Sequence, residues 1–382
     1  MVGSLACLTA CGGNASAGGE GDSTGPIKIM QIAPYQSPSF SLPFMKSSIE
    51  AAAAELNEAG GINGRKVTVV PCDSKYDPNE ELRCAQKAVQ EKAAAVVGGL
   101  MMNGAQALAV LGQAKIPSIG ADAITPDDAK SPASFLFDAG LPGYAAMPAV
   151  AKEKLGATRI ATFNNESATV KTNNDYFKQG AKLAGVKIVS SVTIPNDAVD
   201  YSQFVARAEA DGAQAIVSPM TSESNLKLFK ALGTAGSKLR VVLSASSVTP
   251  NLVKEAGSAA NGSWLVQGTP NAAGDNQWGA AYVAAMEKYE PKEKVYSGVG
   301  LRAYYALRLF AQVMEKESRP ATSANVWDAF SKVSNMKFAW IDDLDFTKPG
   351  PVPNLPRVVS SKVFMLQIKN GKFVPAGDMN PF

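Results

Sequence analysis

The stretch "AAAAELNEAGGINGRKVTVV", residues 51–70, shows how this chain is built. Its first part is rich in alanine, leucine and glutamate, which favour a helix, and the glycines at 60 and 61 indicate where that helix ends. The run "KVTVV" that follows is short, apolar and β-branched, which predicts a strand buried inside a sheet. A helix followed so closely by a buried strand is typical of parallel sheets that are covered by helices.

The same alternation extends in both directions from this stretch. Amphipathic segments that predict helices separate short apolar segments that predict strands, and these strands are expected at residues 27–34, 66–73, 93–100, 116–123, 159–165, 186–194, 213–220 and 239–246. Strands that alternate with helices indicate a parallel sheet with helices on both faces. After residue 270, two further helices are expected at 277–290 and 298–316, and a hairpin is expected around Asn370-Gly371.

The two halves of the chain have similar sequence patterns. The segment "AAAVVGGLM" corresponds to "AQAIVSPMT", so that Val97 and Val217 lie 120 positions apart, and Gly112 and Gly233 lie 121 apart. A nearly constant offset over two consecutive elements is what a duplicated lobe leaves in a sequence. The predicted fold class is α/β, with two doubly wound parallel-sheet lobes.

Composition excludes several classes of function. The chain has 382 residues, 37 basic and 34 acidic side chains, and no histidine. The balanced charge and the absence of a basic run argue against a nucleic-acid partner. Without histidine, the commonest general base, the commonest metal ligand and every Ser-His pair are missing, so we expect neither an enzyme nor a metal site nor a cofactor.

The N-terminal segment looks like a processed leader followed by a tether. "LTACGG", residues 8–13, ends an apolar run at Cys11, and the Gly/Ser/Asn-rich segment up to residue 25 has the composition of a flexible linker. Leu8-Thr9-Ala10-Cys11 resembles the lipobox of bacterial lipoproteins, which implies a lipid on Cys11 and an extracytoplasmic chain, lipid-anchored to the outer face of the cell membrane or periplasmic. The alternative is that Cys7 and Cys11 are ordinary cysteines of the chain terminus.

Two further cysteines, Cys72 and Cys84, lie in the part expected to fold. In an exported protein they are expected to form a disulfide, and the alternative is a pair of buried free thiols. Two cysteines without a histidine cannot complete a tetrahedral zinc site.

Polar loops follow the predicted strands in both halves. In open parallel sheets, ligands bind outside the carboxyl ends of the strands, so two facing lobes would place such loops around one ligand. These loops are rich in Ser, Thr, Asn and Gly and poor in charge, and they are found at 35–40, 100–104, 120–125, 164–169, 219–224 and 244–249. Residues of this kind hold a small molecule by hydrogen bonds and shape.

The segment "NEAGGINGRKV" at 57–67, the "CDSKYDPNE" turn, "VVGG", "IPSIGADAITP" and "DYSQFVARAEADGAQAIV" resemble the solute-binding proteins of branched-chain amino-acid ABC transporters. The resemblance runs from about residue 26 to the end of the chain. It implies a type I periplasmic-binding-protein clamshell with three crossovers, which closes on a ligand and delivers it to an ABC permease. The expected division is a tether at 1–25, a first lobe at 26–141 plus 272–340, and a second lobe at 142–271 plus 341–382.

The resemblance also implies how an amino acid would be held. Members that bind amino acids use Ser/Thr groups of the first lobe for the carboxylate, and an acidic residue with aromatic hydroxyls of the second lobe for the ammonium. In this sequence Gly104 and Ile124 stand where the serine and threonine are expected. Thr169 and Thr221 stand in place of tyrosines, and Ala245 or Ser246 stands at the acidic position. A branched-chain amino acid is therefore not the expected ligand, and a less polar organic acid, an amide or an aromatic compound fits better.

Thirteen residues are predicted to contact the ligand: Tyr35, Ser37, Met102, Asn103, Gly104, Asp122, Ala123, Ile124, Ser167, Thr169, Thr221, Ser246 and Tyr304. Met101, with Met102 and Ile124, is expected to make the first-lobe wall apolar. For Asp122 the alternative is capping of the turn before Pro126, and for Tyr304 it is packing in the core. The expected partners are a small molecule and a permease, with membrane contact only through the lipid anchor and the protein itself a monomer. The competing function is a receptor ectodomain that signals through a partner protein.

The lipobox interpretation predicts that Cys11 carries a lipid in the native host. Replacing the thiol, as in Cys11→Ala, should move the protein from the membrane fraction to the soluble fraction, because the acylation site is lost. Fractionation followed by immunoblotting measures the shift, and Cys7→Ala is the matched control. Unchanged partitioning of Cys11→Ala would rule the anchor out.

Overall fold

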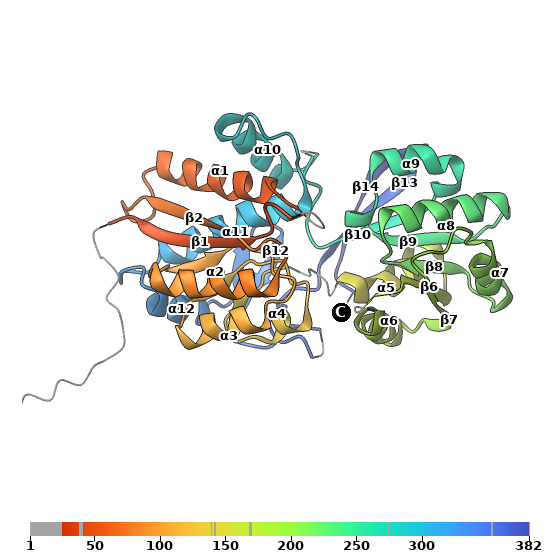
Figure 1. Ribbon diagram of the computed structural model, residues 1–382, viewed down its shortest axis with the longest axis horizontal. Coiled ribbons are helices and arrows are strands. Elements are labelled where there is room, and N and C mark those ends of the chain that lie inside the picture. Colours follow the sequence, from red (N-terminus) through yellow and green to blue (C-terminus); the bar gives the residue numbers. More distant parts are fainter. Residues whose placement is uncertain are drawn as a thin grey trace, which may run out of the picture.

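The computed structural model describes residues 25–37, 41–138, 140, 143–167, 170–273, 275–352 and 354–381. The chain forms two lobes, each around its own sheet, as the ribbon in Figure 1 shows. The first sheet is entirely parallel and has the order β2-β1-β3-β4-β5. Its strands are β1 (Ile27–Ala33), β2 (Val67–Asp73), β3 (Ala95–Val97), β4 (Ser118–Ile119) and β5 (Ser134–Phe135).

The second sheet has seven strands in the order β14-β13-β10-β9-β8-β6-β7. They are β6 (Arg159–Asn165), β7 (Lys187–Ile194), β8 (Ala215–Ser218), β9 (Arg240–Ser244), β10 (Trp264–Gln267), β13 (Val363–Lys369) and β14 (Lys372–Met379). Its parallel part, β7-β6-β8-β9-β10, repeats the strand order of the first lobe, which confirms that the halves are alike. The strands β5 and β10 were not predicted from the sequence.

The C-terminal hairpin was predicted and is present. β13 pairs antiparallel with both β10 and β14. Asn370 and Gly371 connect β13 to β14 with φ values of 50° and 73°, the pair of positive angles that a tight type I′ turn requires. The hairpin therefore adds two antiparallel strands to an otherwise parallel sheet.

Helices cover the sheets in both lobes. They are α1 (Phe44–Glu58), α2 (Pro78–Gln90), α3 (Ala105–Gln113), α4 (Pro126–Lys130), α5 (Gly143–Leu155), α6 (Val170–Ala184), α7 (Ser202–Ala210), α8 (Ser222–Thr234), α9 (Pro250–Ala256), α10 (Gln277–Tyr289), α11 (Gly298–Met314) and α12 (Ser323–Ser331). Two 3-10 turns, η1 (Ala245–Ser247) and η2 (Gly257–Ala260), and a small antiparallel sheet of β11 (Met336–Phe338) and β12 (Ile341–Leu344) complete the elements.

The segment at 57–67 is a compact joint between α1 and β2. Gly61 has φ 79°, and a Cβ there would collide with the carbonyl oxygen of Arg65, so the position requires glycine. The Asn57 side chain donates to Val67 O at 2.8 Å, and its Oδ1 accepts from Val67 N at 2.7 Å. These two hydrogen bonds tie the end of the helix to the start of the strand, which explains why this stretch is a recognisable motif.

The chain passes between the lobes three times. It leaves the first sheet after β5, returns after β10, and crosses again between β12 and β13 (Figure 1). α10, α11 and the β11–β12 sheet pack with β1, β3 and β5 in one apolar core, which contains Tyr282, Leu301 and Ile341. β12 therefore packs in the first lobe, whereas the predicted boundary at residue 340 assigned it to the second lobe. The predicted ranges of the two lobes otherwise stay a prediction.

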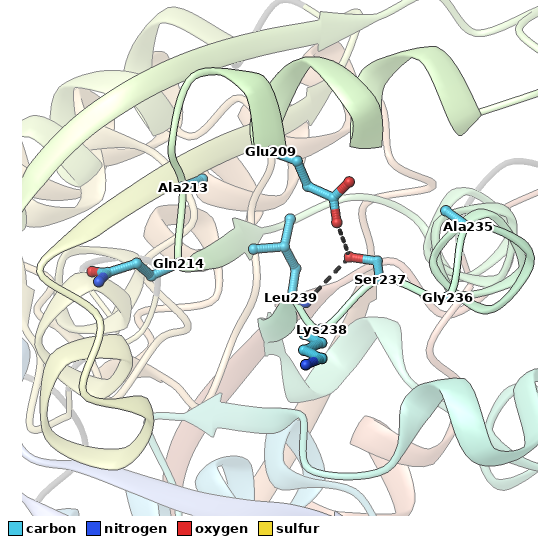
Figure 2. Close-up of a pocket in the computed structure, with 8 residues that line it drawn as sticks. All are labelled: Glu209, Ala213, Gln214, Ala235, Gly236, Ser237, Lys238 and Leu239. Carbon is cyan, nitrogen blue, oxygen red and sulfur yellow. Dashed lines mark hydrogen bonds between the residues drawn. The ribbon is translucent and has the colours of Figure 1, made fainter.

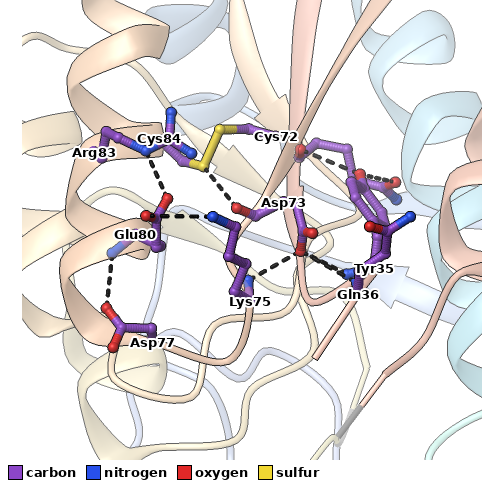
Figure 3. The surroundings of a disulfide bond; sticks show 10 residues. Tyr35, Gln36, Cys72, Asp73, Lys75, Asp77, Glu80, Arg83 and Cys84 are labelled. Carbon is purple, nitrogen blue, oxygen red and sulfur yellow. Dashed lines mark hydrogen bonds and ion pairs between the residues drawn. A yellow bond between two sulfur atoms is a disulfide. The ribbon is translucent and has the colours of Figure 1, made fainter. Parts of the chain in front are cut away.

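The disulfide between Cys72 and Cys84 is present, as predicted. It joins the end of β2 to α2 across a Cα–Cα distance of 5.8 Å (Figure 3). Asp77 caps α2 by accepting from Asn79 N and Glu80 N, and Pro78 occupies the first helical position. The cross-link and the cap together fix the helix against the edge of the first sheet.

The disulfide should contribute to stability mainly by restricting the unfolded chain. In the chain-entropy model a loop of this length gives about 3 kcal/mol, so a Cys72→Ser/Cys84→Ser variant should unfold at a clearly lower denaturant concentration. Adding reductant to the wild type should produce the same shift, and the variant itself should not respond to reductant. Equal midpoints for oxidised and reduced wild type would contradict this expectation.

Candidate ligand-binding site

The carboxyl ends of the strands in the two lobes adjoin each other. The first crossover leaves the carboxyl end of β5 and the second leaves the carboxyl end of β10. Ala121 and Ala123, which follow β4, pack in one cluster with Ala145 of α5 and Tyr176 of α6. The strand-end loops of both lobes therefore meet at the crossovers, which is where the sequence places the ligand.

We use the name strand-end loops for the segments that follow these strands. They are residues 34–43, 74–77, 98–104, 120–125 and 136–142 in the first lobe, and 166–169, 195–201, 219–221, 245–249 and 268–276 in the second.

The loop after β3 is held by a buried carboxylate. Glu81 of α2 has no exposed surface, and its two oxygens accept from Met102 N at 2.7 Å and from Asn103 N at 2.9 Å. Burial raises the pKa of Glu81, and the two backbone hydrogen bonds oppose that shift. The two amides are thus satisfied from within the protein.

The loop after β4 is held in the same way. Asp128 is buried in α4, and its Oδ2 accepts from Ile124 N at 3.1 Å and from Thr125 N at 2.8 Å. The Thr125 hydroxyl in turn accepts from Asp128 N, so that the two residues form a capping box at the start of α4. Burial raises the pKa of Asp128 to about 7 despite these hydrogen bonds. The cap of this turn is therefore Thr125 with Asp128, and not Asp122.

The structure shows the surroundings of Gly104 and Ile124, the two positions at which a serine and a threonine were expected. Gly104 precedes α3 and is buried, and a Cβ on it would come within 3.2 Å of Met101 Cβ and 3.3 Å of Asp128 Oδ1. A serine at this position would therefore crowd Met101 and Asp128. Ile124 is half-buried and presents an apolar side chain instead of a hydroxyl.

Asp122 belongs to a buried ionic triad. Its Oδ2 lies 2.8 Å from Arg302 Nη1, and Arg302 Nε donates to Asp138 Oδ2 at 2.6 Å. The side chains of Arg302 and Asp138 are almost fully buried, whereas that of Asp122 is 16% exposed. Burial raises the pKa of Asp138 to about 6, and Arg302 opposes the shift. Asp122 is thus the member of the triad that a ligand can reach.

Two predicted contacts, Tyr35 and Tyr304, and one residue expected in the first-lobe wall, Met101, are buried inside the first lobe. The Tyr35 hydroxyl donates to Gln31 Oε1 at 2.7 Å inside the first lobe, and its backbone N–H donates to Asp73 Oδ1 (Figure 3). Tyr304 is fully buried and donates to Glu55 Oε2 of α1 at 2.6 Å, so it lies in the core. Met101 is also buried in the core, and the expectation that it lines the wall is wrong.

An apolar patch remains at the first-lobe strand ends. It consists of Leu42, Phe44, Met102, Ile124 and Val299, which are partly exposed and pack on a small cluster around Leu100 and Met45. We call this set the apolar patch. Ile124 of the patch lies on the same loop as Asp122, and Leu100 forms a β-bridge with Asp122, so the patch adjoins the loop that carries this partly exposed carboxylate.

The second lobe contributes a neutral polar network. Thr221 caps α8, and its backbone N–H donates to Asn165 Oδ1 at 3.0 Å. Asn165 Nδ2 donates to Ser224 Oγ at 2.8 Å, and the Ser244 and Ser246 hydroxyls lie 2.8 Å apart. These bonds hold the loops after β6, β8 and β9 in place without a charge.

Tyr144 connects the two sets of loops. It lies on α5 and packs against the cluster that contains Ala121 and Ala123 of the loop after β4. Burial raises the pKa of Tyr144, the Ser244 side chain lowers it, and the charge of Asp122 raises it to a smaller extent. The loop that carries Asp122 and helix α5 therefore meet at the junction between the lobes.

The remaining predicted residues occupy loop positions. Asn103, Ser167, Thr221 and Ser246 are exposed, Ser37 is half-buried, and Ala123 is buried against Gly140 of the first crossover. Thr169, like Cys7 and Cys11, lies outside the described residues. Whether any of these residues contacts a ligand stays a prediction.

Sequence reasoning missed Glu81, Asp128, Arg302 and Tyr144. Asp128 was available from the pattern "TPDD", since Ser/Thr followed three residues later by an acid is a capping-box signature. Arg302 is charged within the apolar run "GVGLRAYYALRLF", which indicates a buried ion pair. Glu81 and Tyr144 have no local signal, because their partners lie in distant segments.

Two surface hollows lie away from these loops. One has a volume of about 440 Å³ and is lined by the segment 235–239 with Glu209, Ala213 and Gln214 (Figure 2). It lies at the amino ends of β8 and β9, opposite the strand-end loops. The other, of about 510 Å³, lies between α3 and the segment from α4 to β5. Neither is lined by the triad, the apolar patch or the second-lobe network.

Within the described ranges, no group of three or more cysteine, aspartate or glutamate side chains is arranged to hold a metal ion. None of the helices in that part of the chain combines the length and hydropathy of a bilayer-spanning segment.

Asp128 should make stability depend on pH. Its folded pKa of about 7 exceeds the ordinary 3.8, so between these values the folded state binds more protons and the free energy of unfolding should fall as pH rises. Asp128→Asn should flatten part of this slope, as measured by urea unfolding across that range. Asp127→Asn removes an exposed carboxylate from the same helix and should leave the slope unchanged. An unaltered slope in Asp128→Asn would contradict the assignment.

Comparison with known proteins agrees with this architecture. A family model described as periplasmic binding protein matches residues 26–371. A Leu/Ile/Val-binding protein homologue of Brucella abortus is 24% identical over 356 residues, which cover 85% of this chain and 81% of that protein.

Solved structures show the same fold. A protein from Brucella ovis that binds leucine, isoleucine, valine, threonine and alanine, in a closed conformation, is 18% identical with a TM-score of 0.74, covering 93% of this chain and 95% of that one. An extracellular ligand-binding receptor from Verminephrobacter eiseniae is 22% identical with a TM-score of 0.71, covering 91% and 99%. Members of the matched family are solute-binding proteins and not enzymes. The chain therefore belongs to the periplasmic binding protein family, and its fold is that of the type I members of the branched-chain amino-acid transporter type.

Proposed function

We propose that this chain is the extracytoplasmic substrate-binding protein of an ABC importer. It closes its two lobes on a small organic ligand and delivers that ligand to a permease of the branched-chain amino-acid type. The family match and the names of the relatives support the general role of solute binding.

The observation that carries this proposal is the junction of the strand-end loops. One lobe brings a partly exposed carboxylate beside an apolar patch, and the other brings hydroxyl and amide groups that are already fixed by hydrogen bonds. Sites of this composition orient a small molecule between apolar surface and a few polar groups. The chain has no histidine, and binding with release accounts for these groups better than a reaction does.

We further propose that the ligand is not a standard branched-chain amino acid. Four backbone amides at the first-lobe strand ends, those of Met102, Asn103, Ile124 and Thr125, donate to Glu81 and Asp128. The hydroxyls expected at 104 and 124 are replaced by glycine and isoleucine. This part of the site therefore offers a ligand carboxylate few donors.

The proposed place of action is the outer face of the cell membrane or the periplasm, with a lipid on Cys11 as the only contact with the bilayer. The sequence motif at 8–11 supports the anchor, and the family supports an extracytoplasmic role. We expect the protein to act as a monomer.

A receptor ectodomain is the second candidate function. The same two lobes could report ligand binding to a signalling partner, and one structural relative is described as an extracellular ligand-binding receptor. Neighbouring genes for a permease and an ATPase would support import, whereas a neighbouring sensor kinase would support signalling.

The proposal predicts ligand-dependent closure. Protein purified from its native host should release a small molecule on unfolding, and mass spectrometry identifies that compound. Adding it to refolded protein should reduce the radius of gyration in small-angle X-ray scattering, because the lobes approach each other. A refolded sample without the compound is the control, and no compaction by any released compound would contradict the proposed function.

Standard amino acids should bind weakly. Each lost hydrogen bond to a charged head group costs about 1.5–3 kcal/mol, so several such losses reduce affinity by orders of magnitude. Calorimetry of refolded protein with leucine, isoleucine, valine and phenylalanine should show no submicromolar binding. Submicromolar binding of any of the four would show that the amino-acid head group is held in another way.

A further inference from the structure

We propose that the first lobe recognises a cationic amine, with Asp122 as the counter-charge and the apolar patch as the surface for an apolar body. This inference rests on the proposed function, because it names the ligand class of the same site. An organic acid would require a positive group or N–H donors in place of the Asp122 carboxylate. Four observations support the amine.

The first observation is the charge of the strand-end loops. Among their described residues the acidic side chains are Asp77, Asp122, Asp138, Glu166, Asp197, Asp200 and Asp275. Lys75 is the single basic side chain in the same described segments, and its ammonium lies 3.7 Å from Glu80 Oε1. The whole chain carries a formal charge of +3, so this acidic edge is a local feature. Such a field favours the approach of cations and disfavours anions.

The second observation is the occupation of the backbone amides. Glu81 and Asp128 already accept the N–H groups of the loops after β3 and β4. A ligand carboxylate would have to displace one of these buried carboxylates, which would leave that carboxylate buried without its partners. These four amides are therefore taken by the protein's own carboxylates, whereas Asp122 keeps a partly exposed carboxylate for a ligand.

The third observation is the state of the triad. Arg302 lies between Asp122 and Asp138, at 2.8 Å and 2.6 Å, so a single guanidinium is shared by two carboxyl groups. The two buried members are inaccessible, and the exposed part belongs to Asp122. A ligand ammonium placed against Asp122 would form a charge-assisted hydrogen bond.

The fourth observation is the neighbourhood of Asp122. Ile124 of the apolar patch lies on the same loop as Asp122, and Met102 lies on the loop after β3. Tyr144 of α5 packs against Ala121 and Ala123 of the loop that carries Asp122. The second-lobe network adds hydroxyl and amide groups but no charge. The arrangement fits an amine with a compact aliphatic or aromatic body and no carboxylate.

Calorimetry of the refolded full chain with matched probes tests this inference. Isoamylamine and isocaproate share one apolar body, phenethylamine and hydrocinnamate share another, and leucine and phenylalanine carry both charged groups. We expect the amine of each pair to bind at least tenfold more tightly than the acid or the amino acid, because only the amine pairs with Asp122.

Two variants locate the contact. Asp122→Asn should weaken binding of the amines about tenfold or more, whereas Asp127→Asn, which removes an exposed carboxylate of α4 outside the strand-end loops, should change it less than threefold. Ile124→Ala should weaken phenethylamine through the apolar patch while sparing a small cation such as methylamine. Circular dichroism and thermal melting establish that each variant is folded, and the amine-to-acid ratio of the wild type tests the proposal without any variant.

The outcomes separate this inference from the proposed function. An acid that binds more tightly than its matched amine, no amine binding, or an unchanged affinity in folded Asp122→Asn would overturn the amine assignment. If the compound released from native protein closes the lobes in those cases, the solute-binding function stands and only the ligand class is wrong. If no released compound produces closure, the proposed function fails as well.

Discussion

The guanidinium of Arg302, buried between two carboxylates, is the interaction on which the ligand site depends. It joins three segments that are far apart in sequence: α11 through Arg302 itself, the loop after β4 through Asp122, and the first crossover through Asp138. Breaking a buried ion pair by removing one partner typically costs about 3–5 kcal/mol, because a charge is left without compensation. The geometry of the loop and of the crossover is therefore tied to the segment in which the chain returns to the first lobe after β10.

Buried carboxylates also determine what the first lobe can offer a ligand. Glu81 and Asp128 each accept two backbone amides, so the loops after β3 and β4 are closed by groups of the protein itself. Glu81 lies three residues before Cys84 on α2, and the disulfide joins that helix to β2. A covalent link, a helix and a buried acid thus hold one loop from within the first lobe.

The two lobes share a strand order but not a chemistry. Both sheets have the order 2-1-3-4-5 in their parallel parts, so the same edge of each lobe carries the loops. The first lobe places an ionic triad and an apolar patch there, whereas the second places serine, threonine and asparagine side chains that bond to one another. A duplicated scaffold therefore positions two different surfaces toward one junction.

The sequence by itself determined the fold class and the positions of helix ends, caps and turns. Periodicity, glycines such as Gly61, the cap at Asp77 and the Asn370-Gly371 turn act over a few residues, so they can be read locally. The disulfide could also be predicted from the sequence, because only two cysteines, Cys72 and Cys84, lie in the part expected to fold. The tertiary structure decided which polar groups are free: Tyr304 and Asp122 have partners in distant segments, and Glu81 takes two amides of a loop that follows another strand. Burial and pairing depend on contacts between residues up to hundreds of positions apart, and no local pattern contains them.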